Sequence, residues 1–254
     1  MTIITHDSTL ESGLTLLRTP SRRSAAVHRL VCEYLADVHA SPGRSDRPAE
    51  KPATAGSSRG RAYWIDAGNV ASTHALYECA PGSGRALERL RIARAFTAYQ
   101  HHSLVRAVVR RADADTPLVI APNVASLYRD GDLREWERTD LLASTLAVLG
   151  ELGRGLECPV VITAGPNVPG TTVERLEAAA DSTIECTRTR EGLRFEGEGF
   201  ETMGYWHGPV WQTTIPYWVN LFGAVDPERP WEPRTETETG TDHPSIDPLE
   251  GVLA

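Results

Sequence analysis

The chain has 254 residues, of which 41% are hydrophobic, and a formal net charge of −8. At about 100 to 200 residues per domain, this length suits one large domain or two small ones and argues against three. No run approaches the ~18 consecutive apolar residues of a membrane helix, and the polar N-terminal stretch lacks the layout of a secretory signal. We therefore expect a soluble cytoplasmic protein without a membrane partner.

The negative charge is concentrated at the end of the chain. Residues 226–254 contain eight acids against two arginines, and we expect this segment to be an acidic, disordered tail. Since the tail carries −6 of the total of −8, residues 1–225 have a net charge of only −2. The strongly basic footprint typical of a nucleic-acid binder is absent. The arginines between residues 85 and 111 keep DNA open as a partner, although a solvated face is the favoured interpretation.

Neither the cysteines nor the histidines have the spacing of metal ligands. The four cysteines lie far apart and include no CxxC pair, so buried free thiols are favoured over a zinc site or a disulfide framework. His101 and His102 have no acidic or cysteine partner at ligand spacing, which favours packing or surface roles. We expect no metal and no other cofactor.

Apolar periodicity predicts an α/β protein. The pattern predicts strands at 13–17, 62–66, 92–96, 116–124 and 158–165. Between them it predicts helices at 24–38, 84–90, 102–112 and 132–153, and it ends in an antiparallel hairpin over 182–201. Strands that alternate with helices imply a mainly parallel sheet with helices on both faces, here with a C-terminal antiparallel hairpin extension. We expect one core domain over 1–225, in which 40–61 is a mobile surface insertion rich in Pro, Gly, Ser and charge.

The segment between the first strand and the first helix has the setting of a phosphate-binding loop without its residues. That motif requires glycine at its first and sixth positions, then lysine and then Ser or Thr. Here the eight positions are 17–24, and only Ser24 fits. Both glycines are missing, Pro20 removes a backbone N–H, and Arg22 places a side chain where the backbone must approach a phosphate. Arg23 keeps the positive charge at the lysine position, but its planar fork does not replace a compact ammonium.

Three stretches match one family in order and spacing. They are AYWIDAGN (62–69), IARAFTAYQHH (92–102) and the long stretch from LVIAPNV to TAGPNV (118–168). The first is similar to a second strand ending in I-D-T-E-G and the second to an A-R-A-F/Y segment. The third is similar to a Walker B strand, a first DNA-binding loop, a long helix and a V-V-V-T strand. From about residue 13 to 200 the chain resembles the core of the RecA/RadA recombinase superfamily, above all its archaeal RadA branch.

The resemblance implies that the catalytic groups of this family are missing here. The Walker B aspartate, which would hold magnesium, falls on Ala121, and the glutamate that would polarise water falls on Gly68. The polar pair that senses the γ-phosphate is replaced by Ala164 and Gly165. Phosphoryl transfer depends almost entirely on positioning and charge stabilisation, so we expect a protein that does not hydrolyse ATP.

Asp66 and the aromatic segment 200–222 each have a structural and a functional interpretation. Asp66 at a strand end is favoured as a cap or turn residue over a remnant active-site carboxylate. For 200–222, closure of one end of the sheet is favoured over a partner-binding surface, and stacking on single-stranded DNA comes third. Neighbouring prolines favour exposure of Trp211 and Trp218, which are the partner-binding candidates.

The sequence as a whole predicts a catalytically inactive RecA/RadA-like paralogue. We expect a binding or regulatory protein in DNA recombination and repair, with a protein partner that is a recombinase or a second copy of itself. The alternative is a divergent nucleotide-binding ATPase in which Arg22, Arg23, Ser24 and Asp66 still hold a phosphate. A third interpretation is an interaction scaffold unrelated to DNA, since a fold does not fix function.

Overall fold

One sheet of nine strands organises the part of the chain that the structure describes. The computed structural model describes residues 10–40, 60–80, 84–129, 133–190, 192–198, 200–207 and 210–213. The strands are β1 (Gly13–Arg18), β2 (Ala62–Ala67), β3 (Leu90–Ala95), β4 (Val119–Ala121), β5 (Pro159–Ala164), β6 (Ser182–Arg188), β7 (Gly192–Gly197), β8 (Phe200–His207) and β9 (Val210–Thr213). Their order in the sheet is β3-β2-β4-β5-β1-β6-β7-β8-β9.

The sheet has a parallel part and an antiparallel part. The six strands from β3 to β6 in this order pair in parallel, and β1 lies between β5 and β6. The turn after β6 reverses the chain, so that β6, β7, β8 and β9 pair antiparallel. The predicted α/β class, the mainly parallel sheet and the antiparallel hairpin over 182–201 are therefore confirmed.

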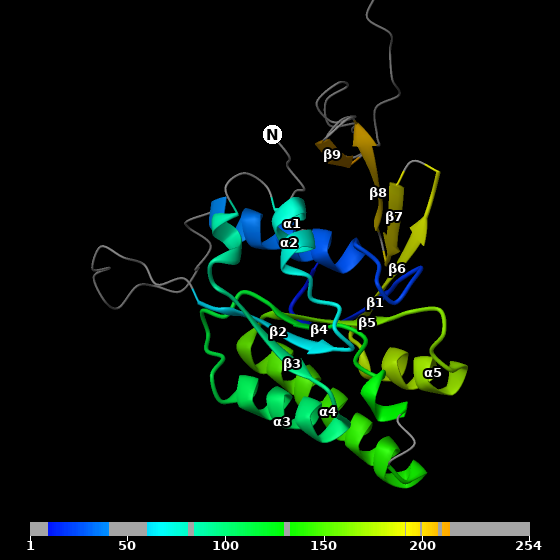
Figure 1. Ribbon diagram of the computed structural model, residues 1–254. Coiled ribbons are helices and arrows are strands. Elements are labelled where there is room, and N and C mark those ends of the chain that lie inside the picture. The colour runs from blue at the N-terminus through cyan, green and yellow to red at the C-terminus, as the bar shows by residue number, and fades with distance from the viewer. Residues whose placement is uncertain are drawn as a thin grey trace, which may run out of the picture. The chain divides into compact units, whose positions relative to one another are not determined.

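Helices cover both faces of the sheet. Figure 1 shows α1 (Ala26–Ala40) and α2 (Thr73–Cys79) on one face, and α3 (Ala98–Val109), α4 (Glu135–Leu156) and α5 (Gly170–Ala179) on the other. Two short 3-10 helices, η1 (Arg85–Leu87) and η2 (Leu127–Arg129), lie in connections. This layering follows from parallel pairing, because each crossover connection carries a helix across a face of the sheet.

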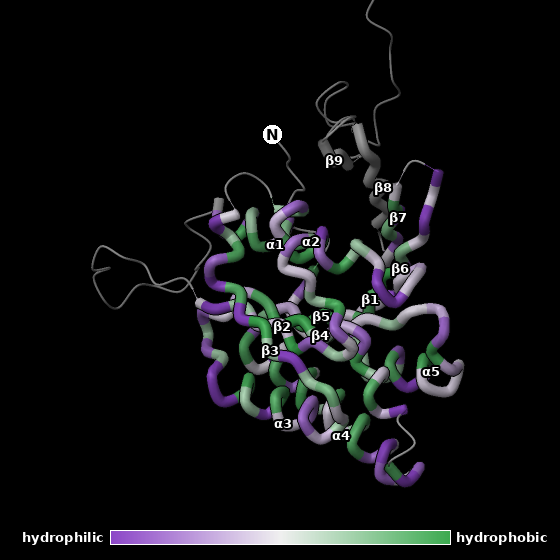
Figure 2. Tube along the Cα trace, in the orientation of Figure 1, coloured by the Kyte–Doolittle hydropathy of each residue, from purple (hydrophilic) through white to green (hydrophobic). Residues whose placement is uncertain are grey.

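The core consists of two apolar layers, one on each face of the sheet. Along β2, Tyr63 and Ile65 belong to the layer under α3 and α4, whereas Trp64 belongs to the layer under α1. Successive side chains of a strand point to opposite faces, so a strand covered on both sides has no polar alternation. Figure 2 shows the hydrophobic residues gathered along these central strands and the helices beside them.

Two helices and several boundaries differ from the sequence predictions. The helices α2 and α5 are absent from those predictions, and the expected strand over 116–124 narrows to Val119–Ala121. The helix α3 begins at Ala98, four residues before its predicted start, because the Thr97 side chain accepts the backbone N–H of Gln100 and caps it.

Parts of the predicted domain organisation lie outside the described residues. These parts are residues 41–59 of the expected insertion and the whole acidic tail 226–254. All the described residues belong to one compact unit. No helix within them combines the length and the apolar character that crossing a membrane requires.

Candidate functional site

The carboxyl ends of four neighbouring strands bring together the positions at which the resemblance would place catalytic groups. The strands β2, β4, β5 and β1 are consecutive in the sheet and parallel. Gly68 follows β2, Ala121 ends β4, Ala164 ends β5, and the degenerate loop 19–25 follows β1. Open α/β sheets bind their ligands in crevices at this edge, outside the carboxyl ends of the strands. This edge is therefore the candidate site.

The loop after β1 packs directly onto the end of β5. The Thr19 backbone N–H donates to the Ala164 carbonyl oxygen at 2.8 Å. The one Thr19 hydroxyl proton is shared between the carbonyl oxygens of Ser21 at 3.0 Å and Ala164 at 3.3 Å. At Gly165 a Cβ atom would lie 3.2 Å from the backbone nitrogen of Arg22. The absence of a side chain at position 165 thus lets the loop approach the strand end closely.

The loop offers few groups to a phosphate. The Thr19 N–H is bonded to β5, Pro20 has no N–H, and the Ser24 N–H donates to the Ser21 carbonyl oxygen at 3.1 Å. The buried Ser24 hydroxyl accepts the backbone N–H of Ala26, the first residue of α1, at 3.2 Å. The one residue that fits the phosphate-loop motif therefore caps a helix.

Arg22 crosses the site and reaches the end of β2. Its guanidinium Nη2 lies in the space that a Cβ atom at Gly68 would occupy, and Gly68 has a φ of 86° that favours glycine. The Asn123 side-chain Nδ2 donates to the Arg22 carbonyl oxygen at 3.1 Å and holds the backbone below it. Arg23 is exposed beside the loop.

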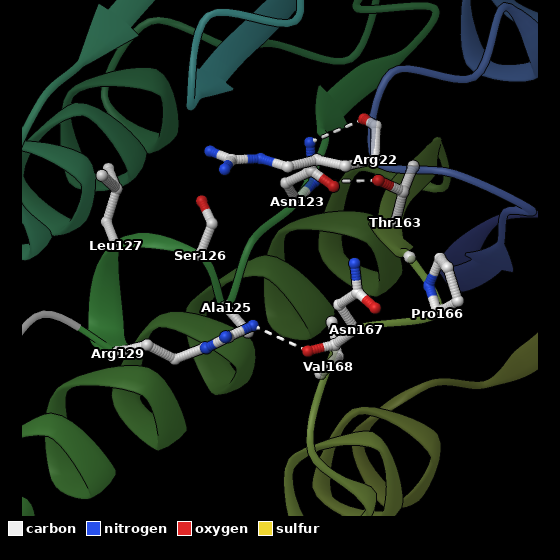
Figure 3. Close-up of a pocket in the computed structure, with 11 residues that line it drawn as sticks. Arg22, Asn123, Ala125, Ser126, Leu127, Arg129, Thr163, Pro166, Asn167 and Val168 are labelled. Carbon is white, nitrogen blue, oxygen red and sulfur yellow. Dashed lines mark hydrogen bonds between the residues drawn. The ribbon is translucent and has the colours of Figure 1, made fainter.

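A pocket of about 390 Å³ opens beside Arg22. Figure 3 shows Arg22 and Arg129 on opposite sides of it. The Arg129 Nη1 donates to the Asn167 carbonyl oxygen at 3.0 Å. The lining residues are Arg22, Asn123, Ala125, Ser126, Leu127, Arg129, Thr163, Gly165, Pro166, Asn167 and Val168. Two cations and no carboxylate line the pocket among the residues that the structure describes, so this lining favours an anionic ligand.

The polar floor of this pocket was missed by the sequence predictions. The Asn123 backbone N–H donates to the Thr163 hydroxyl at 2.8 Å, which ties the end of β4 to β5, and both side chains are buried. The buried Ser126 Oγ has no hydrogen-bond partner within the described residues. The sequence did contain a signal for this polar floor. The tripeptide Pro-Asn-Val follows both β4, at 122–124, and β5, at 166–168.

Asp66 caps the loop after β2. Its fully buried carboxylate accepts the backbone N–H of Val70 at 2.8 Å and of Ala71 at 3.2 Å. Arg94 on the neighbouring strand β3 approaches the same carboxylate with Nε at 3.3 Å and donates from Nη2 to the Ala71 carbonyl oxygen at 2.7 Å. Asp66 does not line the pocket. Its bonds are those of a turn residue.

The partner-binding candidates lie at the limit of the described chain. Trp211 belongs to β9, where its backbone pairs with Trp206 of β8. The side chain of Trp211, and the whole of Trp218, lie outside the described residues. Their exposure stays a prediction.

The described part of the chain contains no group of three His, Cys, Asp or Glu side chains that could hold a metal ion.

The three buried cysteines are not favoured as nucleophiles. Burial raises the pKa of the Cys32 and Cys186 thiols to about 12 and that of the Cys158 thiol to about 11, and the thiolate is the reactive form. No protein-family model and no curated protein matches the sequence.

Proposed function

We propose that this protein is a catalytically inactive RecA/RadA-like binding or regulatory protein that serves DNA recombination and repair without hydrolysing ATP. The observation that carries the proposal is the position of Arg22. Its guanidinium occupies the place beside Gly68, where the resemblance puts the water-polarising glutamate. A guanidinium cation at this point cannot accept a proton from water. The position of the expected carboxylate base therefore holds a positive charge in place of a negative one.

The rest of the edge supports the same conclusion. The position expected for the metal-binding aspartate is Ala121, which is fully buried and offers no oxygen ligand from its side chain. The loop over 19–24 uses its backbone N–H groups at Thr19 and Ser24 within the protein. The proposal is supported because hydrolysis needs a phosphate loop, a metal carboxylate and a base together, and the described residues at the family positions of this edge include none of these groups.

Turnover of ATP with and without single-stranded DNA tests the proposal. We expect the rate with the protein to equal the rate in buffer. Turnover that Ser24→Ala abolishes, and that the control Ser144→Ala on an exposed part of α4 leaves intact, would refute the proposal in favour of the divergent ATPase.

A second candidate function is binding of a phosphate-bearing ligand in the pocket between Arg22 and Arg129. The lining favours it, because its described residues include these two guanidinium groups and no acid. Titration with inorganic phosphate, ATP and single-stranded DNA checks this candidate. Arg129→Gln should weaken binding roughly tenfold, the usual value of one charge-assisted hydrogen bond, whereas Arg106→Gln on the exposed side of α3 should not.

The proposed protein partner is expected to contact Trp211 and Trp218. Alanine at either position should leave the melting temperature within a few degrees and weaken association with the partner or with a second copy of the chain, since interface hot spots are enriched in tryptophan. Co-purification from the native organism, followed by binding measurements on both variants, checks this expectation. If both variants unfold, the segment belongs to the core and the interface hypothesis fails.

A further inference from the structure

A buried chain of polar side chains joins α3, η2 and α4. The His101 Nδ1 lies 2.8 Å from the Tyr128 hydroxyl, which lies 2.8 Å from the Thr145 hydroxyl. The His102 Nδ1 lies 3.0 Å from the same threonine oxygen. The Thr145 hydroxyl in turn lies 2.8 Å from the carbonyl oxygen of Leu141, one helical turn earlier. The side chains of His101, Tyr128 and Thr145 are buried.

The direction of every bond in this chain follows from counting protons. A carbonyl oxygen only accepts, so the single hydroxyl proton of Thr145 is donated to Leu141. The Thr145 oxygen must then accept from Tyr128, which uses the one phenolic proton. Neither hydroxyl has a proton left for an imidazole, so the Nδ1 atoms of His101 and His102 must both be donors.

We propose that this network is a hydrogen-bond chain of fixed direction that sets both histidine tautomers and positions the wall of the pocket. It runs from His101 through Tyr128 and Thr145 to the Leu141 carbonyl, and His102 donates into it at Thr145. In their neutral form, both imidazoles then carry the proton on Nδ1. This inference does not rest on the function proposed above, because the hydrogen-bond chain determines how the pocket wall is held and not what the pocket binds.

The surroundings of His101 agree with this direction. Its Nε2 is buried and has no hydrogen-bond partner within the described residues. An unpartnered acceptor is tolerated better in a protein interior than an unpartnered N–H, so the bare nitrogen is expected to be Nε2 and the protonated one Nδ1. The ring of His101 also meets Tyr128 edge to face, with ring centres 5.6 Å apart, which fixes the orientation of both rings.

The pocket wall is the part of the molecule that this chain holds. Tyr128 is the central residue of η2, and its neighbours Leu127 and Arg129 both line the pocket. The chain connects η2 to α3 through His101 and to α4 through Thr145. Tyr128 is thus a positioning residue, which fixes the direction in which Arg129 enters the pocket.

Nitrogen-15 NMR of the labelled full-length protein near pH 7 tests the direction. We expect both His101 and His102 to show the protonated nitrogen at Nδ1 and the bare nitrogen at Nε2. The opposite tautomer is the commoner one for free imidazole side chains in water, so an undirected network would not give this result. A neutral imidazole with its proton on Nε2 at either residue overturns the proposed direction of the hydrogen-bond chain.

Hydrogen exchange of the backbone amides of residues 126–129 tests the positioning role. Thr145→Val keeps the shape of the side chain and removes the hydroxyl, and we expect these amides to exchange roughly tenfold faster, as one lost buried hydrogen bond predicts. Thr145→Val should also raise the fraction of the Nε2–H tautomer at His101. Without the threonine oxygen, the Tyr128 hydroxyl can donate its proton to an unprotonated Nδ1.

The matched control is Ser144→Ala, which removes the neighbouring exposed hydroxyl of α4 and should change neither measurement. Unchanged exchange and an unchanged tautomer in folded Thr145→Val overturn the positioning role. If that variant does not fold, the hydrogen-exchange comparison on Tyr128→Phe decides the positioning role, because this variant removes the central hydroxyl. The NMR of the wild-type protein still tests the direction.

Discussion

The guanidinium of Arg22 fills the space that a side chain at Gly68 would need. The two residues lie far apart in the sequence and touch in space, so the sizes of their side chains are sterically linked. A glutamate at position 68 alone would force Arg22 out of its place.

Gly68→Ala should lower the free energy of unfolding by about 2 kcal/mol. The backbone there has a φ of 86°, in the left-handed region that costs an L residue about 1 to 2 kcal/mol, and the new methyl group also displaces Arg22. Urea denaturation measures the change.

Gly155→Ala is the control for this substitution. Nothing lies within 4 Å of a Cβ atom built at Gly155 in α4, so this variant should be neutral or slightly stabilising. Combining Gly68→Ala with Arg22→Ala should recover the steric part of the loss. An equal loss in the single and double variants would show that only backbone strain matters.

Asp66→Ala should cost about 3 kcal/mol of stability. The substitution leaves the buried N–H groups of Val70 and Ala71 without an acceptor and removes the partner of Arg94. Arg94→Ala should cost less, because the Arg94 side chain is 44% exposed and both backbone donors keep their carboxylate. Equal losses for the two variants in urea denaturation would mean that the ion pair, and not the loop cap, is the main contribution.

Stability should fall between pH 6.5 and about pH 4 because of His101. Burial, together with the smaller effect of the neighbouring His102, lowers the pKa of this imidazole from 6.5 to about 4. In this interval the unfolded chain binds more protons than the folded one, so the free energy of unfolding decreases as the pH falls, by about 3 kcal/mol in total. Above pH 6.5 the contribution is complete.

Denaturation at several pH values checks this dependence. His101→Asn keeps a side-chain N–H that can donate to Tyr128 but does not titrate, so the slope between pH 4 and 6.5 should become shallower. The control is Ser144→Ala at an exposed position on α4, which removes no titratable group and should leave the slope as it is. An unchanged slope in His101→Asn would assign the pH dependence to other groups.

The fold was predictable where buried elements have a simple hydrophobic pattern in the sequence. The strands β1, β2 and β5 are covered on both faces and therefore read as continuous apolar runs. The short helices α2 and α5 left no such trace, because each buries only one apolar residue, Leu76 and Leu176 respectively. Their starts depend on a local cap at Ser72 and on Pro169, which are weak signals on their own.

The site was predictable only in part, for a related reason. The resemblance located Gly68 and Ala121 separately, as strand ends, and the structure places both strands at one edge. The pocket residues Asn123, Ser126 and Thr163 are brought together by the adjacency of β4 and β5, which hydrophobic periodicity does not encode. Side-chain hydrogen bonds across 40 residues of chain, such as that from Asn123 to Thr163, appear only once the strand order is known.

The position of β1 between β5 and β6 determines how the chain can acquire its structure during synthesis. The strand β1 is made long before both of its partners, over Pro159–Ala164 and Ser182–Arg188. Until those residues leave the ribosome, the apolar side chains of Gly13–Arg18 have neither neighbouring strand to pair with. Such distant pairing slows folding and exposes aggregation-prone segments, so the nascent β1 is a segment that a chaperone would protect.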